Sequence, residues 1–244
     1  LSPEDEAIDV AERAWRDGAR RMVALVPQSS LGDRQLKAFS IRWEALGGTL
    51  VDAVHFGRSP AAYATAVANA FAVQESKDRA NALRRMLGRE LASEAQCRDD
   101  VDAAFIGGSA QDARQLLPQF RYFGATAVKV YATPAVVEGR LDARSDQDLE
   151  GVMAGSTAWE LGLGDDALRR VFGNYWPAGQ GLSRFRSFGV DAWRLAGALD
   201  QLRAPGAAPL QGETGMLAVD SAGVVHRRLY WSRFGDGLPV PLAP

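Results

Sequence analysis

The sequence predicts an α/β fold in which one open, mostly parallel sheet is flanked by helices on both faces. The apolar run at 22–26 is continuous, which is typical of a strand that helices cover on both sides, and 101–106 and 128–132 are predicted as further strands of the same sheet. A strand, a loop and then a stretch of helical spacing recur three times along the chain. This repetition is typical of a Rossmann-like lobe.

The elements follow in order from the first residues. Ser2 and Pro3 are typical of a helix start, and Asp17-Gly18 of its end. Glycines at 47 and 48 separate the next expected helix from the strand after it, which gives a βαβ unit. We expect helices at about 3–16, 34–46, 60–72, 78–91, 110–123, 165–172 and 188–202, strands at 22–26, 49–55, 101–106, 128–132 and 152–154, and a final hairpin of 216–219 with 224–226.

Composition narrows the classes of partner. The 244 residues are 47% hydrophobic and 24% charged, with a formal net charge of -2 and a pI near 5.8. A nucleic-acid surface needs concentrated cation, so we expect no nucleic-acid partner. Cys97 is the single cysteine, which excludes an intramolecular disulfide and a multi-cysteine metal site. No apolar run approaches the length of ~20 residues that a membrane span needs.

Polar and small residues follow three of the expected strands. In an open α/β sheet, the loops at the carboxyl ends of the strands form the crevice in which ligands bind. The alternative is that the serines cap the helices that follow them. The candidate ligand residues are Gln28, Ser29, Ser30, Gly108, Ser109 and Thr133.

Catalytic patterns are missing from the sequence. A serine nucleophile needs an oriented base, but His55 and His226 are the only histidines and no Gly-x-Ser-x-Gly elbow is present. The histidines lack the spacing of a metal site, and no dinucleotide or phosphate-loop fingerprint occurs. We therefore expect no enzyme activity, no metal and no cofactor.

Aromatic residues are concentrated in the least regular region, after residue 155. Rings on irregular segments often anchor a partner, because they bury much area at low entropic cost. Packing between two lobes is the alternative. The candidate partner-contact residues are Trp159, Tyr175, Trp176 and Phe185.

Several segments resemble known families. Residues 23–32, followed by the helix that ends at 43–48, look like the opening of the second lobe in type I periplasmic binding proteins. More narrowly, the chain resembles the penicillin-binding protein activator family of outer-membrane lipoproteins, called LpoA or LppC. The segments that carry this narrower resemblance are 100–106, 113–116, 121–125, 130–133, 188–193, 212–217 and 231–234.

The resemblance implies a non-catalytic periplasmic protein that activates a class A bifunctional peptidoglycan synthase, a penicillin-binding protein, by direct contact. It also implies an outer-membrane lipoprotein whose signal peptide and lipid anchor lie outside this chain, with peptidoglycan as a second candidate partner. Residues 1–155 would form a complete second lobe. Residues 156–244 would be the returning segment of the first lobe plus a hinge hairpin, incomplete without upstream sequence.

Two other functions stay open at this point. A solute-binding or sensory module would close its lobes on a small polar ligand such as an amino acid. An enzyme on a similar sheet ranks third, because a fold by itself does not define a function.

Overall fold

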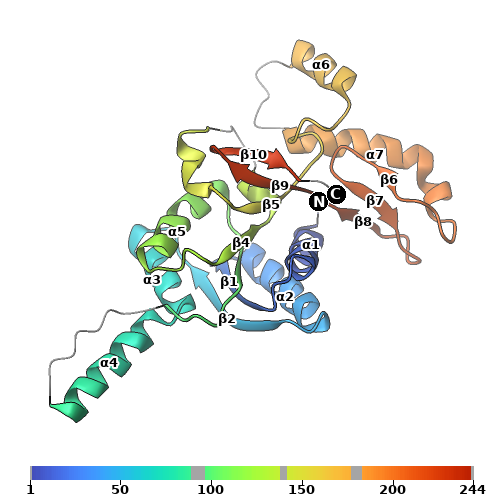
Figure 1. Cartoon of the computed structure of the whole chain (residues 1–244). Helices are drawn as coiled ribbons and strands as arrows, with labels where there is room; N and C mark the ends of the chain where they lie inside the picture. The colour runs from blue at the N-terminus through green and yellow to red at the C-terminus, as the bar shows by residue number, and fades with distance from the viewer. Residues whose placement is uncertain (1, 89–96, 138–141, 177–182, 243–244) are drawn as a thin grey trace.

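A computed structural model of the chain describes residues 2–88, 97–137, 142–176 and 183–242. Its centre is a seven-stranded sheet with the strand order β10-β9-β5-β4-β3-β1-β2 (Figure 1). Strands β1 to β5 pair in parallel, whereas β9 pairs antiparallel with both β5 and β10. The strands of this sheet are β1 (Arg21–Pro27), β2 (Thr49–Phe56), β3 (Ala103–Ile106), β4 (Lys129–Ala132), β5 (Met153–Ser156), β9 (Tyr230–Gly235) and β10 (Leu238–Pro241).

Helices cover both faces of the sheet, as the continuous apolar run at 22–26 predicts. On one face, α1 and α2 pack over a core that includes Phe39 and Trp43. On the other face, α3 and α5 pack over a core that includes Val67 and Leu116, while α4 extends away from the sheet (Figure 1). These helices are α1 (Pro3–Arg16), α2 (Ser30–Ala45), α3 (Pro60–Ala70), α4 (Val73–Leu87) and α5 (Ala110–Tyr122), and short 3-10 turns span Pro134–Val136 and Ser145–Leu149.

A ring cluster under α2 shows why the glycine pair follows that helix. Phe39 stacks on Trp43 and on Phe105, with ring centroids 5.9 and 4.5 Å apart. A side chain at Gly48 would meet the Trp43 indole at 2.2 Å, and Gly47 has φ of +91°. The turn into β2 therefore needs glycine at both positions.

An extension between β5 and β9 carries a second, smaller sheet. Strands β6, β7 and β8 form an antiparallel sheet in that order, with Ala218 of β7 opposite His226 of β8. This pairing confirms the predicted hairpin, and α7 lies alongside the small sheet (Figure 1). The extension comprises α6 (Asp166–Tyr175), α7 (Ser183–Leu202), β6 (Leu210–Gln211), β7 (Met216–Val219) and β8 (Val225–Arg228).

The observed elements differ from the predicted ones in several places. Helices α4 and α7 begin at Val73 and Ser183, each five residues before the predicted start. Helix α2 begins at Ser30 and not at residue 34, so the expected loop 27–33 is wrong in its second half. Strand β10 was not predicted, and β9 and β10 join the large sheet from beyond the lobe boundary expected at residue 155.

Within the described ranges, no helix is both long and apolar enough to cross a bilayer.

Candidate functional site

The three predicted ligand loops meet at one edge of the large sheet. Strands β4, β3 and β1 are neighbours and run parallel, so the loops after them lie together at the carboxyl edge. Gln28, Ser29 and Ser30 are exposed there, whereas Gly108 and Thr133 are buried. The structure thus brings the candidate residues to one edge.

Two of the predicted serines cap helices. The Ser29 hydroxyl oxygen accepts a hydrogen bond from Gly32 N at 3.2 Å and caps α2. The Ser109 hydroxyl oxygen accepts from Asp112 N at 3.3 Å, and the Asp112 carboxylate accepts in return from Ser109 N at 2.9 Å. This capping box fixes the Ser109 loop on the first turn of α5.

Asp112 is the central acid of this edge. Its Oδ1 accepts from the Tyr63 hydroxyl at 2.8 Å and lies 3.4 Å from Arg58 Nε, while its Oδ2 accepts from the Ser109 hydroxyl at 2.7 Å. Burial opposes ionisation of Asp112, but these hydrogen bonds and the Arg58 charge outweigh burial and lower its pKa. Burial and the bond to Asp112 raise the pKa of Tyr63 to about 12. Neither group is poised as a base near neutral pH.

Two buried polar atoms near this edge have no hydrogen-bond partner in the described part of the chain. They are Gln35 Oε1 and Thr133 Oγ1. A side chain on Gly107 would come within 2.8 Å of Gln35 Oε1, so the Gln35 amide lies directly against the loop after β3. A ligand or water that reached them would satisfy both atoms, because buried polar groups in native proteins are normally paired.

Sequence reasoning selected Thr133 but missed Gln35 and Asp112. The spacing Ser109-x-x-Asp112 is the signature of a capping box and marks Asp112. Gln35 carries no such local signal, because its proximity to Gly107 depends on how α2 packs over the sheet.

The histidines and the cysteine occupy separate environments. His55 Nε2 lies 2.9 Å from Asp33 Oδ1, and His226 Nε2 lies 3.1 Å from Asp220 Oδ2, both on exposed surface. The Cys97 thiol donates to the Phe123 carbonyl oxygen at 2.5 Å, and burial raises its pKa. Searched over its described residues, the chain holds no group of three or more His, Cys, Asp or Glu side chains that could bind a metal ion.

The predicted aromatic concentration lies on α6 and α7, which Arg186 joins. Phe172 packs edge-on against Trp159 and lies against Trp176, each with ring centroids 5.6 Å apart. Arg186 of α7 reaches across to α6, where its Nη2 donates to the Trp176 carbonyl oxygen at 3.1 Å. Trp159 itself is buried. The residues that face outward, which we call the aromatic face, are Tyr175, Trp176 and Phe185, with 74%, 57% and 66% of their surface exposed.

A buried carboxylate attaches α7 to the turn before β7. Asp191 Oδ1 accepts from Glu213 N at 2.7 Å, and its Oδ2 accepts from Thr214 N at 2.7 Å and from the Thr214 hydroxyl at 2.6 Å. Glu213 in turn accepts from Arg194 at 3.0 Å. Asp191 and Glu213 lie in two of the segments that carry the family resemblance, 188–193 and 212–217.

A second buried cluster lies where the chain crosses between the two sheets. Glu6 of α1 accepts from Arg184 and from Arg227, the latter at 2.5 Å. Asp9 Oδ2 accepts from Leu229 N at 2.6 Å, and burial raises the pKa of Asp9 to about 6. The cluster ties α1 to both the start of α7 and the end of β8.

Comparison with known proteins identifies the family. The model of the family described as "LppC putative lipoprotein" matches residues 1–237. The chain belongs to this family. The LppC relative from Erwinia tasmaniensis, named penicillin-binding protein activator LpoA, is 29% identical over 263 residues, which cover 99% of this chain and 38% of that protein. The chain therefore spans about two fifths of the length of the curated LppC relatives.

Solved structures confirm the predicted periplasmic-binding-protein-like α/β fold. The C-domain of LpoA (YraM) from Haemophilus influenzae, described as a regulator of PBP1A, superposes with a TM-score of 0.73 at 22% identity, covering 100% of this chain and 68% of that one. An ABC transporter substrate-binding protein from Desulfitobacterium hafniense, in complex with Leu, gives 0.58 at 18% identity, covering 99% and 66%. The LppC chain thus shares its fold with both a regulator and a solute-binding protein.

Proposed function

We propose that this chain is a non-catalytic part of a periplasmic lipoprotein, anchored to the outer membrane, that activates a class A penicillin-binding protein by direct contact. The observation that carries the proposal is the LppC family match over residues 1–237, together with relatives named as penicillin-binding protein activators. Family membership supports the lipoprotein character, and the activator role follows from the names of the relatives.

The site chemistry supports a role without catalysis. Across the described residues, each histidine is paired with a surface carboxylate, and Asp112 at the carboxyl edge is held as an anion by several donors. A serine nucleophile needs an adjacent oriented base, and Ser29 and Ser109 instead cap helices. An assay for hydrolysis of peptidoglycan by the purified chain should therefore give no product.

The aromatic face is the surface that we assign to the synthase. Exposed Tyr and Trp are the residue types most enriched among interface hot spots, because they bury a large area with few rotatable bonds. The aromatic face combines one Tyr, one Trp and one Phe ring at the end of α6 and the start of α7, and the buried Trp159 packs against Phe172 of α6. Contact at this face would remove these rings from water.

The test is binding to, and stimulation of, a purified class A synthase. Trp176→Ala and Phe185→Ala should each weaken binding about tenfold or more, as expected for truncated hot spots. Tyr122→Ala is the matched control, because Tyr122 is a 79% exposed aromatic residue on α5, away from the aromatic face. Equal binding by all three variants would remove the aromatic face from the proposal, and no binding by the unaltered chain would refute the activator role.

The lobe division is also a proposal. We assign residues 1–155 to one lobe and residues 156–244 to the returning segment of the other, with the hinge at the hairpin. The division is supported by the buried Glu6 and Asp9, which join α1 of the 1–155 lobe to Arg184, Arg227 and Leu229 of the returning segment. Strands β9 and β10 are the exception to this division, because they pair into the large sheet beside β5.

A solute-binding function is the second candidate, and the unpaired atoms of Gln35 and Thr133 favour it. A ligand that binds the folded state raises its stability by mass action. A rise in melting temperature with free amino acids, abolished by Thr133→Val, would support this function. A shift that Thr133→Val leaves unchanged would argue against this edge as the site.

A further inference from the structure

A cavity lies at the opposite end of the same strands from the carboxyl edge. It has a volume of about 360 Å³ and is formed by the end of α5, the loop before β4 and the loop before β5. Volumes of this order hold small-molecule ligands. The cavity, called the amino-edge cavity below, shares none of its lining residues with the sites described above.

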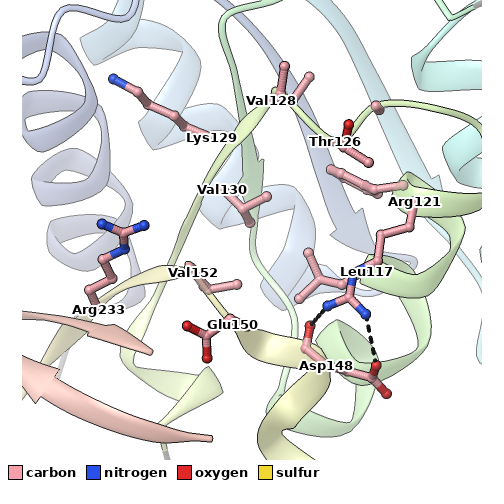
Figure 2. Close-up of a pocket in the computed structure, with 14 residues that line it drawn as sticks. Leu117, Arg121, Thr126, Val128, Lys129, Val130, Asp148, Glu150, Val152 and Arg233 are labelled. Carbon is pink, nitrogen blue, oxygen red and sulfur yellow. Dashed lines mark hydrogen bonds and ion pairs between the residues drawn. The ribbon is translucent and has the colours of Figure 1, made fainter. Parts of the chain in front are cut away.

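The floor of the amino-edge cavity is apolar. Val130, Val152 and Leu117 are buried side chains that contribute to it, and Figure 2 shows the two valines at its centre. On one side of this floor, Arg121 donates to Asp148 Oδ1 at 3.2 Å and to the Asp148 carbonyl oxygen at 3.1 Å. This ion pair forms a wall whose charges are already compensated.

The opposite side of the cavity carries charges that are not compensated. Lys129 and Arg233 both lie on that side, Lys129 above and Arg233 below, and Glu150 lies on the rim beneath them (Figure 2). Within the described ranges of the chain, none of these three exposed side chains forms an ion pair or hydrogen bond. The arrangement leaves two cations and one carboxylate around an apolar floor.

Gly151 leaves open space next to the Arg233 guanidinium. It has φ of +83°, and a side chain placed on it would lie 4.0 Å from Arg233 Nη2. The Arg233 guanidinium therefore lies close to the backbone of Gly151. A small anion fits such a position, because a carboxylate pairs well with a guanidinium and an ammonium group.

We infer that the amino-edge cavity binds an apolar residue with a free α-carboxylate. The carboxylate lies between Lys129 and Arg233 above Gly151, and the apolar side chain rests on Val130 and Val152. Glu150 accepts from the nitrogen of the same residue. The source of this residue is either a free amino acid, which presents an ammonium group to Glu150, or the carboxyl end of a peptide, which presents an amide N–H.

Calorimetric titration of the whole chain with three probes tests the inference. The probes are leucine, N-acetyl-alanyl-leucine with a free carboxylate, and the same peptide as its carboxamide. The free-carboxylate peptide should bind about tenfold more tightly than the carboxamide, because a charge-assisted pair is lost in the latter. Binding of leucine alone identifies a free amino acid as the source, and binding of the acid peptide identifies a peptide end.

Charge-removal variants place the ligand in this cavity. Lys129→Gln and Arg233→Gln should each weaken binding of the carboxylate probe about tenfold. Lys37→Gln, at an exposed lysine of α2 outside the cavity, is the matched control and should bind as the unaltered chain does. Absence of binding by every carboxylate probe, equal binding of acid and amide, or binding that both cavity variants retain would overturn the inference. The aromatic-face variants leave this titration unchanged, so the two proposals fail separately.

Discussion

Asp191 provides the sharpest test of how the extension is held together. The carboxylate is 2% exposed and accepts three hydrogen bonds, from Glu213 N, Thr214 N and the Thr214 hydroxyl. Asp191→Ala leaves these three donors buried without an acceptor, and each unsatisfied group costs about 1–3 kcal/mol. We therefore expect a loss of at least about 3 kcal/mol from the free energy of unfolding. Asp191→Asn, which keeps one acceptor oxygen, should lose about half as much.

The assay is urea unfolding followed by circular dichroism, with hydrogen exchange of the Glu213 and Thr214 amides as a local probe. Asp200→Ala is the control on the same helix, because Asp200 is exposed, and it should change stability by no more than about 0.5 kcal/mol. The reasoning is refuted if Asp191→Ala unfolds within about 1 kcal/mol of the unaltered chain and both amides stay protected. That result would mean that the two amides have other acceptors.

Four further variants test a buried acid, two glycines and a helix cap. Burial raises the pKa of Asp9 to about 6, so between about pH 4 and 6 the folded protein holds a proton that the unfolded chain has lost, and stability falls as the pH rises through this window. Asp9→Asn should remove this pH dependence of the free energy of unfolding, which amounts to at most about 3 kcal/mol. Urea midpoints of the variant that change with pH in parallel with those of the unaltered chain would contradict this prediction. Gly48→Ala should lower the free energy of unfolding by about 1–3 kcal/mol, because the added methyl group overpacks against Trp43. Gly189→Ala, in open space within α7, should instead raise it by about 0.5–1 kcal/mol. Equal melting temperatures of the two variants would disprove the clash at Gly48. Ser109→Ala should cost about 1 kcal/mol in the same thermal assay, and no loss would show that the cap is dispensable.

The sequence predicts the central strands β1 and β3 because burial on both faces imposes a composition that can be read locally. Strand β1, for example, is buried at every residue after Arg21, and its apolar run is continuous. Strand β10 has no such signal. It carries Pro239 and Pro241, which an edge strand tolerates, and among the described strands its partner is β9, which in turn pairs with β5.

The sequence predicts those residues of the candidate site that belong to a local pattern, and not those that meet only in the folded chain. Ser29 and Ser109 were selected from their places after strands, and the structure shows both as helix caps. Asp112 meets Tyr63 across 49 residues of sequence, and Gln35 meets Gly107 across an even longer interval. Such pairs depend on how helices settle over the sheet, which periodicity does not specify.

The segments that identify the family carry two kinds of residue, and this matters for where a partner would bind. Asp191 is buried and holds the 212–215 turn, and a side chain at Gly212 would lie 2.6 Å from its carboxylate, so both positions are constrained by the scaffold. Trp193, two residues further along α7, is 83% exposed and makes no comparable bond within the described chain. Of the residues in these segments, the buried ones, such as Asp191, identify the fold. Only exposed residues can contact a partner, so under the proposed activator role, if the contact extends along α7 beyond the aromatic face, Trp193→Ala should lower synthase binding while leaving the urea midpoint unchanged. Asp191→Ala should instead lower both, and a Trp193→Ala variant that unfolds early would place that ring in the scaffold.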